Sequence, residues 1–199
     1  MLRSSFTKTL VEAGCDEAGR GCLAGPVVAA AVIFPKKYRH KLLNDSKQLT
    51  REEREALRLD IERDALAWAV AEVDHEEIDR INILNASFKA MHLALDKLSM
   101  IPEIILVDGN RFKPYKDIRY ECIIKGDGKY LSIAAASILA KTHRDNLMGR
   151  LALQFSGYGW ETNVGYATLE HREGIKAQGI TPYHRRSFTL LPEQLQLFD

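Results

Sequence analysis

Short apolar segments bounded by turn-forming residues recur along the chain and predict β-strands. The first two are separated by a glycine-rich bend that contains Pro26, and the later ones end in glycine-containing turns. The expected strands cover residues 10–16, 27–34, 68–73, 104–107 and 118–125.

Between and after these strands, apolar residues recur every three or four positions and predict helices. Leu84, Phe88, Met91 and Leu95 have this spacing within a helix expected over about residues 83–98. Two more helices are expected over about residues 132–155 and 168–177.

Two pairs of polar residues have the spacing of a helix-capping box. Thr50 with Glu53 opens a helix that we expect to run to about residue 65. Asp74 with Glu77 repeats the pattern ahead of the helix at 83–98. Strands come early and helices late, so we predict an α/β fold with one central mixed sheet flanked by helices. The periodicity does not determine the order of the strands in that sheet.

The composition indicates a globular protein of ordinary domain size. The chain has 199 residues, of which 46% are hydrophobic and 28% charged, enough to bury a core. The length suits one domain, with at most a small appended element.

The cellular location is expected to be the cytoplasm. The longest apolar runs are far shorter than the ~20 residues that span a bilayer, and the first residues contain no apolar signal segment. The three cysteines, Cys15, Cys22 and Cys122, form no C-x-x-C motif, which is typical of a reducing compartment. No membrane contact is expected, and nothing in the sequence indicates more than a monomer.

Charge alone does not identify a partner. The net charge is +1, but residues 111–186 carry thirteen Lys and Arg against seven Asp and Glu. This local excess fits a surface that faces phosphates. A solvated face is the alternative interpretation, and it is the one that charge alone favours.

Four carboxylates follow predicted strands and lie beside glycine-containing turns. They are Asp16, Glu17, Asp108 and Asp127. Like charges raise one another's pKa when they are crowded, so such a cluster is costly without a cation. Oxygen ligands without His or Cys suit Mg²⁺ or Mn²⁺, and two such ions can act together on a phosphodiester. Taken singly, each acid is also compatible with an ordinary turn residue.

The adjacency of Asp16 and Glu17 imposes a geometric condition. Neighbouring side chains on a regular strand point to opposite faces. We therefore expect the chain to bend at the glycine-rich residues 18–21, so that both acids can serve one site.

Seven sequence blocks occur in an order that resembles the ribonuclease HII family. They are 14–21 (GCDEAGRG), 44–49 (NDSKQL), 107–110 (VDGN), 125–127 (KGD), 135–141 (AASILAK), 165–168 (GYAT) and 184–188 (HRRSF). The match runs from about residue 11 to 188. It implies a ribonuclease H-like fold, with a single catalytic domain over residues 1–199 in which residues 156–191 form a helical C-terminal part that contacts substrate and residues 192–199 a tail. It also implies an endonuclease that hydrolyses RNA in RNA–DNA hybrids and incises 5′ of single ribonucleotides embedded in duplex DNA.

The resemblance also implies residue roles. Asp16, Glu17, Asp108 and Asp127 would be the catalytic, metal-binding carboxylates, with Mg²⁺ or Mn²⁺ as cofactor. Asp145 on the predicted long helix is a second choice for the fourth acid, and we expect it to make a salt bridge or a surface contact instead.

Substrate contacts follow from the same resemblance. The backbone of Gly19, Arg20 and Gly21, helped by Tyr166, would hold the 2′-hydroxyl, the group that separates ribose from deoxyribose. The residues expected to meet phosphates are Lys47, Arg185 and Arg186.

Two positions depart from the family pattern. Val164 stands where the family often has Lys, and Ala134 where it usually has Ser. We expect either change to alter substrate affinity without abolishing catalysis.

The C-terminal tail resembles the short peptide with which bacterial replication and repair enzymes bind the sliding clamp. The residues concerned are Gln194, Leu195, Leu197 and Phe198. Their apolar side chains could fill a pocket of the clamp, or pack on this chain's own core as a last helical turn.

Two other functions remain open at this stage. One is a non-catalytic nucleic-acid-binding domain of the same fold, which would gain nothing from crowded carboxylates near phosphates. The other is a different two-metal nuclease, such as a junction resolvase or a ribonuclease H for long hybrids. Gly19-Arg20-Gly21 with Tyr166 argues against that second alternative.

Overall fold

A mixed β-sheet forms the centre of the molecule in a computed structural model that describes residues 2–43 and 49–191. Within these residues five strands are ordered β3-β2-β1-β4-β5. Strands β1, β2 and β3 pair in antiparallel fashion, whereas β4 and β5 run parallel to β1. The strands are β1 (Glu12–Ala18), β2 (Val27–Ile33), β3 (Ala67–Val73), β4 (Ile104–Asp108) and β5 (Arg119–Ile123). The parallel strands bring the ends of β1, β4 and β5 to the same edge.

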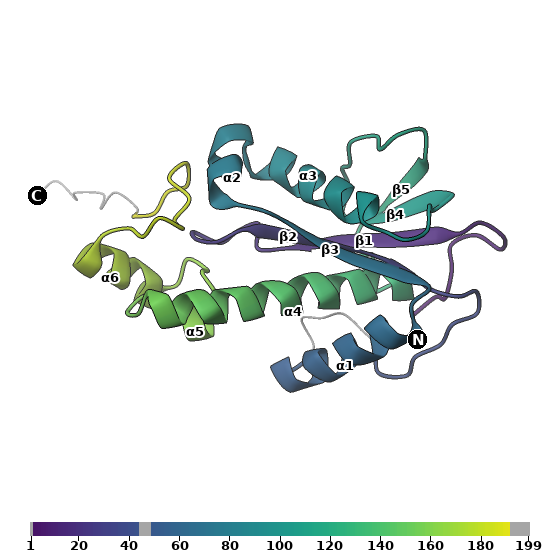
Figure 1. Ribbon diagram of the computed structural model, residues 1–199, viewed down its shortest axis with the longest axis horizontal. Helices are drawn as coiled ribbons and strands as arrows, with labels where there is room; N and C mark the ends of the chain where they lie inside the picture. Colours follow the sequence, from purple (N-terminus) through teal and green to yellow (C-terminus); the bar gives the residue numbers. More distant parts are fainter. Residues whose placement is uncertain (1, 44–48, 192–199) are drawn as a thin grey trace, which may run out of the picture.

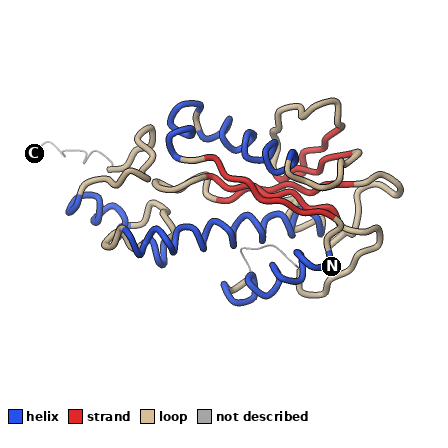
Figure 2. The backbone as a smooth tube through the Cα atoms, viewed as in Figure 1, coloured by secondary structure: helices blue, strands red, loops and turns tan. Residues whose placement is uncertain are grey.

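Helices cover both faces of this sheet (Figure 1). On one face lie α2 (His75–Ile81) and α3 (Ile83–Asp96); on the other lies the long helix α4 (Leu131–Gln154). Helix α1 (Arg51–Asp64) packs mainly on α4. Figure 2 shows the resulting three layers of helix, sheet and helix. All seven residues of β2 are buried, as expected for a strand covered on both sides.

Helix α4 crosses β1 at very short range, and a glycine permits this approach. A Cβ atom on Gly14 would lie 2.3 Å from the carbonyl carbon of Ser132. The facing turns of α4 consist of small buried residues, Ala134, Ala135 and Ala136. The close contact places the next turn of α4, with Ser137, beside the end of β1.

The predicted elements are confirmed, with differences at their ends. The Thr50–Glu53 capping box is present in full. The segment after Asp74 forms its own short helix, which the sequence did not resolve from the following one. Asn82 separates the two helices because its backbone has φ of 65°, a left-handed value that an α-helix cannot contain.

The C-terminal part packs on the end of α4 and on the loop after β1. It contains α5 (Trp160–Asn163), which the sequence did not predict, and α6 (Leu169–Gln178). Trp160 is fully buried in a cluster with Leu23 and Met148. The division at residues 156–191 stays a prediction. Among the helices described, none combines the length and apolar character needed to cross a bilayer.

Candidate active site

Strand β1 continues through both adjacent acids, contrary to the expected bend. The antiparallel ladder with β2 pairs Asp16 with Ala30, Glu17 with Ala29, and Ala18 with Val28. The expected bend at residues 18–21 therefore comes after both acids and does not turn Glu17 toward the side of Asp16, because the ladder stays regular through Ala18. Regular pairing places the two side chains on alternate faces of the strand.

The two acids consequently have different surroundings. Asp16 is buried on the α4 side, where its carboxylate accepts hydrogen bonds from the Ser137 hydroxyl and from the Glu17 backbone N–H, the latter at 2.7 Å. Glu17 lines a cavity on the α3 side and forms an ion pair with Arg20 at 3.0 Å. The two acids flank the end of β1 from both faces of the sheet.

Asp108 and Asp127 lie at the neighbouring strand ends. Asp108 is the last residue of β4, and its Oδ1 accepts a hydrogen bond from the Gly126 backbone N–H at 2.6 Å. Gly126 has no room for a side chain, since a Cβ there would lie 2.6 Å from Ile133 Cδ1. This contact holds the turn with Asp127 next to Asp108. Asp127 itself is buried, and its Oδ1 accepts from Gly128 N at 3.0 Å.

A cavity of about 300 Å³ opens beside this strand end. It is lined by Glu17, Arg20 and Asp108, together with the following residues 109–111 and several side chains of α3. Glu17 and Asp108 therefore line the same cavity as the positively charged side chain of Arg20.

The acids influence one another electrostatically. Burial, followed by the charges of Glu17 and Asp108, raises the pKa of Asp16 well above its ordinary value. Burial also raises the pKa of Glu17; the Arg20 guanidinium opposes this shift and Asp108 adds to it. A divalent cation would compensate this accumulation of negative charge.

The donor set fits a hard cation, because it consists of carboxylate oxygens. Within residues 2–43 and 49–191, however, no three Asp, Glu, His or Cys side chains converge closely enough to enclose a metal ion. The structure brings Asp16, Glu17 and Asp108 into electrostatic contact and the turn with Asp127 next to Asp108, without closing a ligand shell.

The glycine-rich loop after β1 (residues 19–26) is held by hydrogen bonds from Arg144, a buried arginine of α4. Arg144 donates through Nε to the Pro26 carbonyl at 3.0 Å and through Nη2 to the Ala24 carbonyl at 3.0 Å. Gly19 has φ of 93°, and a Cβ on it would lie 2.0 Å from Arg144 Nε. Only glycine satisfies both the backbone conformation and the presence of Arg144.

Arg185 supports the same loop. Its Nε donates to the Gly25 carbonyl at 2.9 Å and its Nη1 to the Arg20 carbonyl at 3.0 Å. The side chain is fully buried, and burial lowers its pKa to about 10, so it stays charged at neutral pH. This placement does not suit the expected phosphate contact, because the guanidinium lies underneath the loop rather than on the surface.

Tyr166 lies beside this loop, although 144 residues separate it from Cys22, with which it forms an isolated β-bridge. Its side chain is 42% exposed. The turn before it is held by Arg144, whose Nη1 donates to the Val164 carbonyl at 2.8 Å. Arg144 therefore joins the loop to the turn that carries Tyr166.

The remaining predicted phosphate contacts have different outcomes. Arg186 is exposed, and its backbone N–H donates to Asp79 at 2.8 Å. Lys47 lies outside the described residues.

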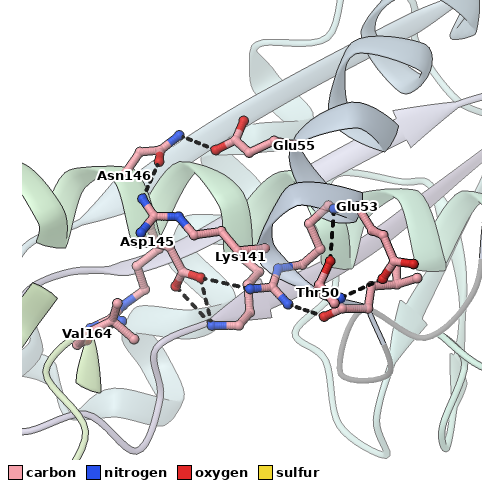
Figure 3. A network of polar contacts seen from close by, with 11 residues as sticks. Thr50, Glu53, Glu55, Lys141, Asp145, Asn146 and Val164 are labelled. Carbon is pink, nitrogen blue, oxygen red and sulfur yellow. Dashed lines mark hydrogen bonds and ion pairs between the residues drawn. The ribbon is translucent and has the colours of Figure 1, made fainter. Parts of the chain in front are cut away.

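Asp145 is engaged in a polar network between α1 and α4 (Figure 3). It pairs with Lys141 at 2.9 Å and with Arg54 at 3.5 Å. The expected salt bridge is confirmed, but Asp145 is buried rather than on the surface. Arg54 also donates to the Leu49 carbonyl at 2.6 Å, so this network anchors the start of α1 on the helix that holds Arg144.

Comparison with known proteins places these features in one family. The family model described as Ribonuclease HII matches residues 13–191. A ribonuclease HII from Bacteroides fragilis is 62% identical over 200 residues, covering all of both chains. The counterpart from Parabacteroides distasonis is 63% identical over 187 residues, covering 94% of each.

The chain belongs to the ribonuclease HII family. It is accordingly an endoribonuclease, with the ribonuclease H-like α/β fold that the sequence predicted. Solved structures agree with this assignment. The ribonuclease H2 of Pyrococcus horikoshii superposes with a TM-score of 0.76 at 29% identity, covering 90% of this chain and 94% of that one.

A second ribonuclease HII structure was solved as a complex with PCNA, from Archaeoglobus fulgidus. It has a TM-score of 0.76 at 30% identity and covers 95% of this chain and all of that one. A more distant structure, Bst-RNase HIII in complex with Mn²⁺, has a TM-score of 0.71 at 22% identity and shows the common fold. That match covers 91% of this chain and 68% of that one.

The two departures from the ribonuclease HII pattern have different structural contexts. Ala134 is fully buried in the apolar cluster between α4 and the sheet, so its side chain faces the core and not a substrate. Val164 lies in the turn before Tyr166 with φ of 44°, a left-handed conformation that is unfavourable for a β-branched residue.

Sequence reasoning did not assign a role to Arg144, His171 or His184, all of which are buried near the glycine-rich loop and Tyr166. His184 and Arg144 stood next to residues that were singled out, but buried polar residues have no sequence periodicity of their own. Arg144 and His171 bind backbone carbonyls, and His184 contacts the Thr181 backbone N–H and His171. The fold brings these partners together, which a sequence motif does not display.

Proposed function

We propose that this chain hydrolyses the RNA strand of RNA–DNA hybrids and incises 5′ of single ribonucleotides embedded in duplex DNA. The products would carry 3′-hydroxyl and 5′-phosphate ends. One observation carries this proposal: the carboxylate end of the sheet and the glycine-rich loop meet at Arg20. This residue lines the cavity with Glu17 and Asp108, and its own carbonyl is held by Arg185.

The carboxylates Asp16, Glu17, Asp108 and Asp127 are proposed to hold Mg²⁺ or Mn²⁺. The raised pKa values of Asp16 and Glu17 support this role, since burial and then the neighbouring carboxylates disfavour the charged forms, and a cation would offset both effects. A bound pair of ions would activate water and stabilise the leaving oxygen of the phosphodiester. The acids supply the ligands, and Ser137 and Gly126 orient two of them through hydrogen bonds.

Ribose recognition is proposed for the loop Gly19-Arg20-Gly21 and Tyr166. A Cβ on Gly21 would meet no atom within 4 Å, so the backbone there is open to a close approach by substrate. The partly exposed Tyr166 ring stands across the β-bridge from the same loop. A 2′-hydroxyl both donates and accepts hydrogen bonds, and this corner offers backbone groups and a phenol to match it.

Phosphate contacts are proposed for Arg186, which is exposed, and for Lys47. For Arg185 the buried position supports a different role: it shapes the loop by binding the carbonyls of Arg20 and Gly25. The free state of the three cysteines supports the expected location in a reducing cytoplasm.

Clamp binding is proposed for the tail residues Gln194, Leu195, Leu197 and Phe198, which lie outside the described residues. The sequence motif supports it, and so does the Archaeoglobus fulgidus relative, which was solved with a PCNA clamp. A pull-down should recover the bacterial sliding clamp with the full chain and not with a chain ending at Pro192. Equal recovery by both would remove the proposal.

The nuclease proposal is tested with duplex DNA that contains one ribonucleotide, in Mg²⁺ and in Mn²⁺. The unmodified chain should incise 5′ of the ribonucleotide, and Asp16→Asn should not. Asp145→Asn is the matched control, because Asp145 is a buried acid outside the proposed ligand set. Incision by Asp16→Asn at the normal rate would overturn the metal assignment. Binding without any incision by the unmodified chain would favour the non-catalytic alternative.

A further inference from the structure

A chain of buried hydrogen bonds lies directly behind Tyr166. His171, in the first turn of α6, places Nδ1 2.8 Å from the Tyr166 carbonyl oxygen. Its Nε2 is 2.9 Å from Trp160 Nε1 and 3.1 Å from Nε2 of His184. His171, Trp160 and His184 are all fully buried, so these contacts form in the absence of competing solvent.

The partners determine where the protons are. The Trp160 indole can only donate, so Nε2 of His171 must be an acceptor, and the proton of the neutral ring is on Nδ1. Nδ1 therefore donates to the Tyr166 carbonyl. His184 accepts at Nδ1 from the Thr181 backbone N–H at 2.9 Å, which leaves its Nε2–H to donate to His171. Trp160 and His184 therefore both donate to His171, and His171 donates to the Tyr166 carbonyl.

This chain connects both halves of the proposed ribose site. The Tyr166 carbonyl receives the His171 bond and a second one from Thr168 N at 2.8 Å. On the other side, His184 forms a β-bridge with Ala24, which belongs to the glycine-rich loop. The half-exposed ring of Tyr166 has solvent on one side, and its hydroxyl forms a hydrogen bond with Cys22, so its direction depends on that bond and on how firmly its own backbone is held.

We propose that His171 is a positioning residue for ribose recognition: its Nδ1–H holds the Tyr166 backbone so that the phenol ring meets a 2′-hydroxyl presented at the Gly19–Gly21 loop. This inference rests on the proposed function of Tyr166. His171 touches neither substrate nor metal, and it acts through Tyr166 alone.

Two substitutions separate this role from a general contribution to the fold. In His171→Asn the side-chain amide nitrogen can occupy the position of Nδ1, so the bond to Tyr166 is kept while the contacts to Trp160 and His184 are lost. In His171→Gln the amide reaches the position of Nε2, so those contacts are kept and the bond to Tyr166 is lost. A purely structural role predicts that Asn is the more damaging change, because it loses more contacts.

The experiment measures two quantities: kcat/KM on duplex DNA with one ribonucleotide, and the affinity for the same duplex without it. We expect His171→Gln to lower kcat/KM about tenfold, as for the loss of one buried hydrogen bond. His171→Asn should stay within about threefold of the unmodified chain. Affinity for the all-DNA duplex should not change in either variant. If Asn is impaired as much as Gln, or if neither is impaired, the inference is overturned.

Tyr166→Phe separates this inference from the proposed function. If Tyr166→Phe keeps full kcat/KM on the single ribonucleotide, the proposed role of Tyr166 fails. If Tyr166→Phe is impaired but His171→Gln is not, only the inference fails. Should His171→Gln not fold, His171→Asn still decides: a folded His171→Asn chain that loses kcat/KM contradicts the proposal, and one that retains it supports it.

Discussion

The carboxylate end of the sheet and the glycine-rich loop lie next to each other but are built in opposite ways. At the sheet end, carboxylates are brought together, and burial with the neighbouring negative charges raises the pKa values of Asp16 and Glu17. Under the loop, the buried residues Arg144, Arg185 and His171 donate to backbone carbonyls, as in the three bonds donated by Arg144. The first region would gain from a cation, whereas the second has its charges matched by hydrogen bonds within the protein.

This difference indicates a division between chemistry and choice of substrate. A site that has to bind a metal benefits from uncompensated charge, whereas a site that has to recognise one hydroxyl group benefits from a fixed backbone. Substitutions in the two regions should therefore change stability in opposite directions.

The largest effect is expected from Asp16→Asn. Activity on the single-ribonucleotide duplex should fall on the order of 10³-fold, since a proposed metal ligand is lost. Stability without divalent metal should rise, because a buried charge that is repelled by Glu17 and Asp108 is removed. Urea unfolding in EDTA measures the second effect. A lower free energy of unfolding for Asp16→Asn in EDTA would contradict the proposed difference between the two regions.

The opposite sign is expected from Arg144→Met. The substitution leaves the carbonyls of Pro26, Ala24 and Val164 without their buried donor, which should cost about 3 kcal/mol of unfolding free energy. Arg150→Met, an exposed position on the same helix, is the control and should change stability by less than about 0.5 kcal/mol. Equal effects of both variants in urea unfolding would show that Arg144 is not a structural anchor.

The two regions should also respond oppositely to acid. Burial lowers the pKa of His184 from 6.5 to about 4, with a smaller contribution from the nearby His171. The unfolded chain binds this proton first, so His184 reduces stability as pH falls from 6.5 to about 4. Asp16 has a raised pKa and takes up its proton first in the folded state, so it adds stability as pH falls through that raised value toward its ordinary one.

Thermal unfolding between pH 4 and 7 tests this contrast. His184→Gln should lose less stability on acidification than the unmodified chain, and Asp16→Asn should lose more. Parallel curves for all three proteins would contradict the assigned directions.

A smaller effect is expected at the turn before Tyr166. Val164→Asn should stabilise the chain by about 1 kcal/mol, because Asn tolerates the left-handed backbone that Val164 adopts. Val70→Asn in β3, where the backbone is extended, should destabilise instead. The melting temperatures of the two variants give the comparison directly.

Much of the fold could be predicted because it follows from local rules. The apolar strands, the Thr50 cap and the spacing of Leu84, Phe88, Met91 and Leu95 all specify their elements without help from distant residues. The separation of α2 from α3 could not be predicted, because it depends on the backbone angle of one residue, Asn82. The strand order depends on packing between distant elements.

For the site, the sequence predicted which residues come together better than it predicted how their side chains are oriented. Asp16, Glu17, Asp108 and the turn with Asp127 do assemble at one edge, because parallel strands end together. The expected bend at residues 18–21 does not bring Asp16 and Glu17 to one side, since pairing with β2 keeps β1 regular through Ala18. The phosphate contact that the resemblance implied for Arg185 does not suit its buried position, because its guanidinium donates to the carbonyls of Gly25 and Arg20.

The support of the glycine-rich loop by Arg185 has a consequence for synthesis of the chain. A ribosome completes all four acids by residue 127, but the arginine that holds the Arg20 carbonyl is residue 185 of 199. A nascent or prematurely terminated chain would therefore contain every proposed metal ligand before its ribose-recognition loop has been anchored. Under the proposed function, discrimination between RNA and DNA would therefore be acquired only when nearly the whole chain has been made.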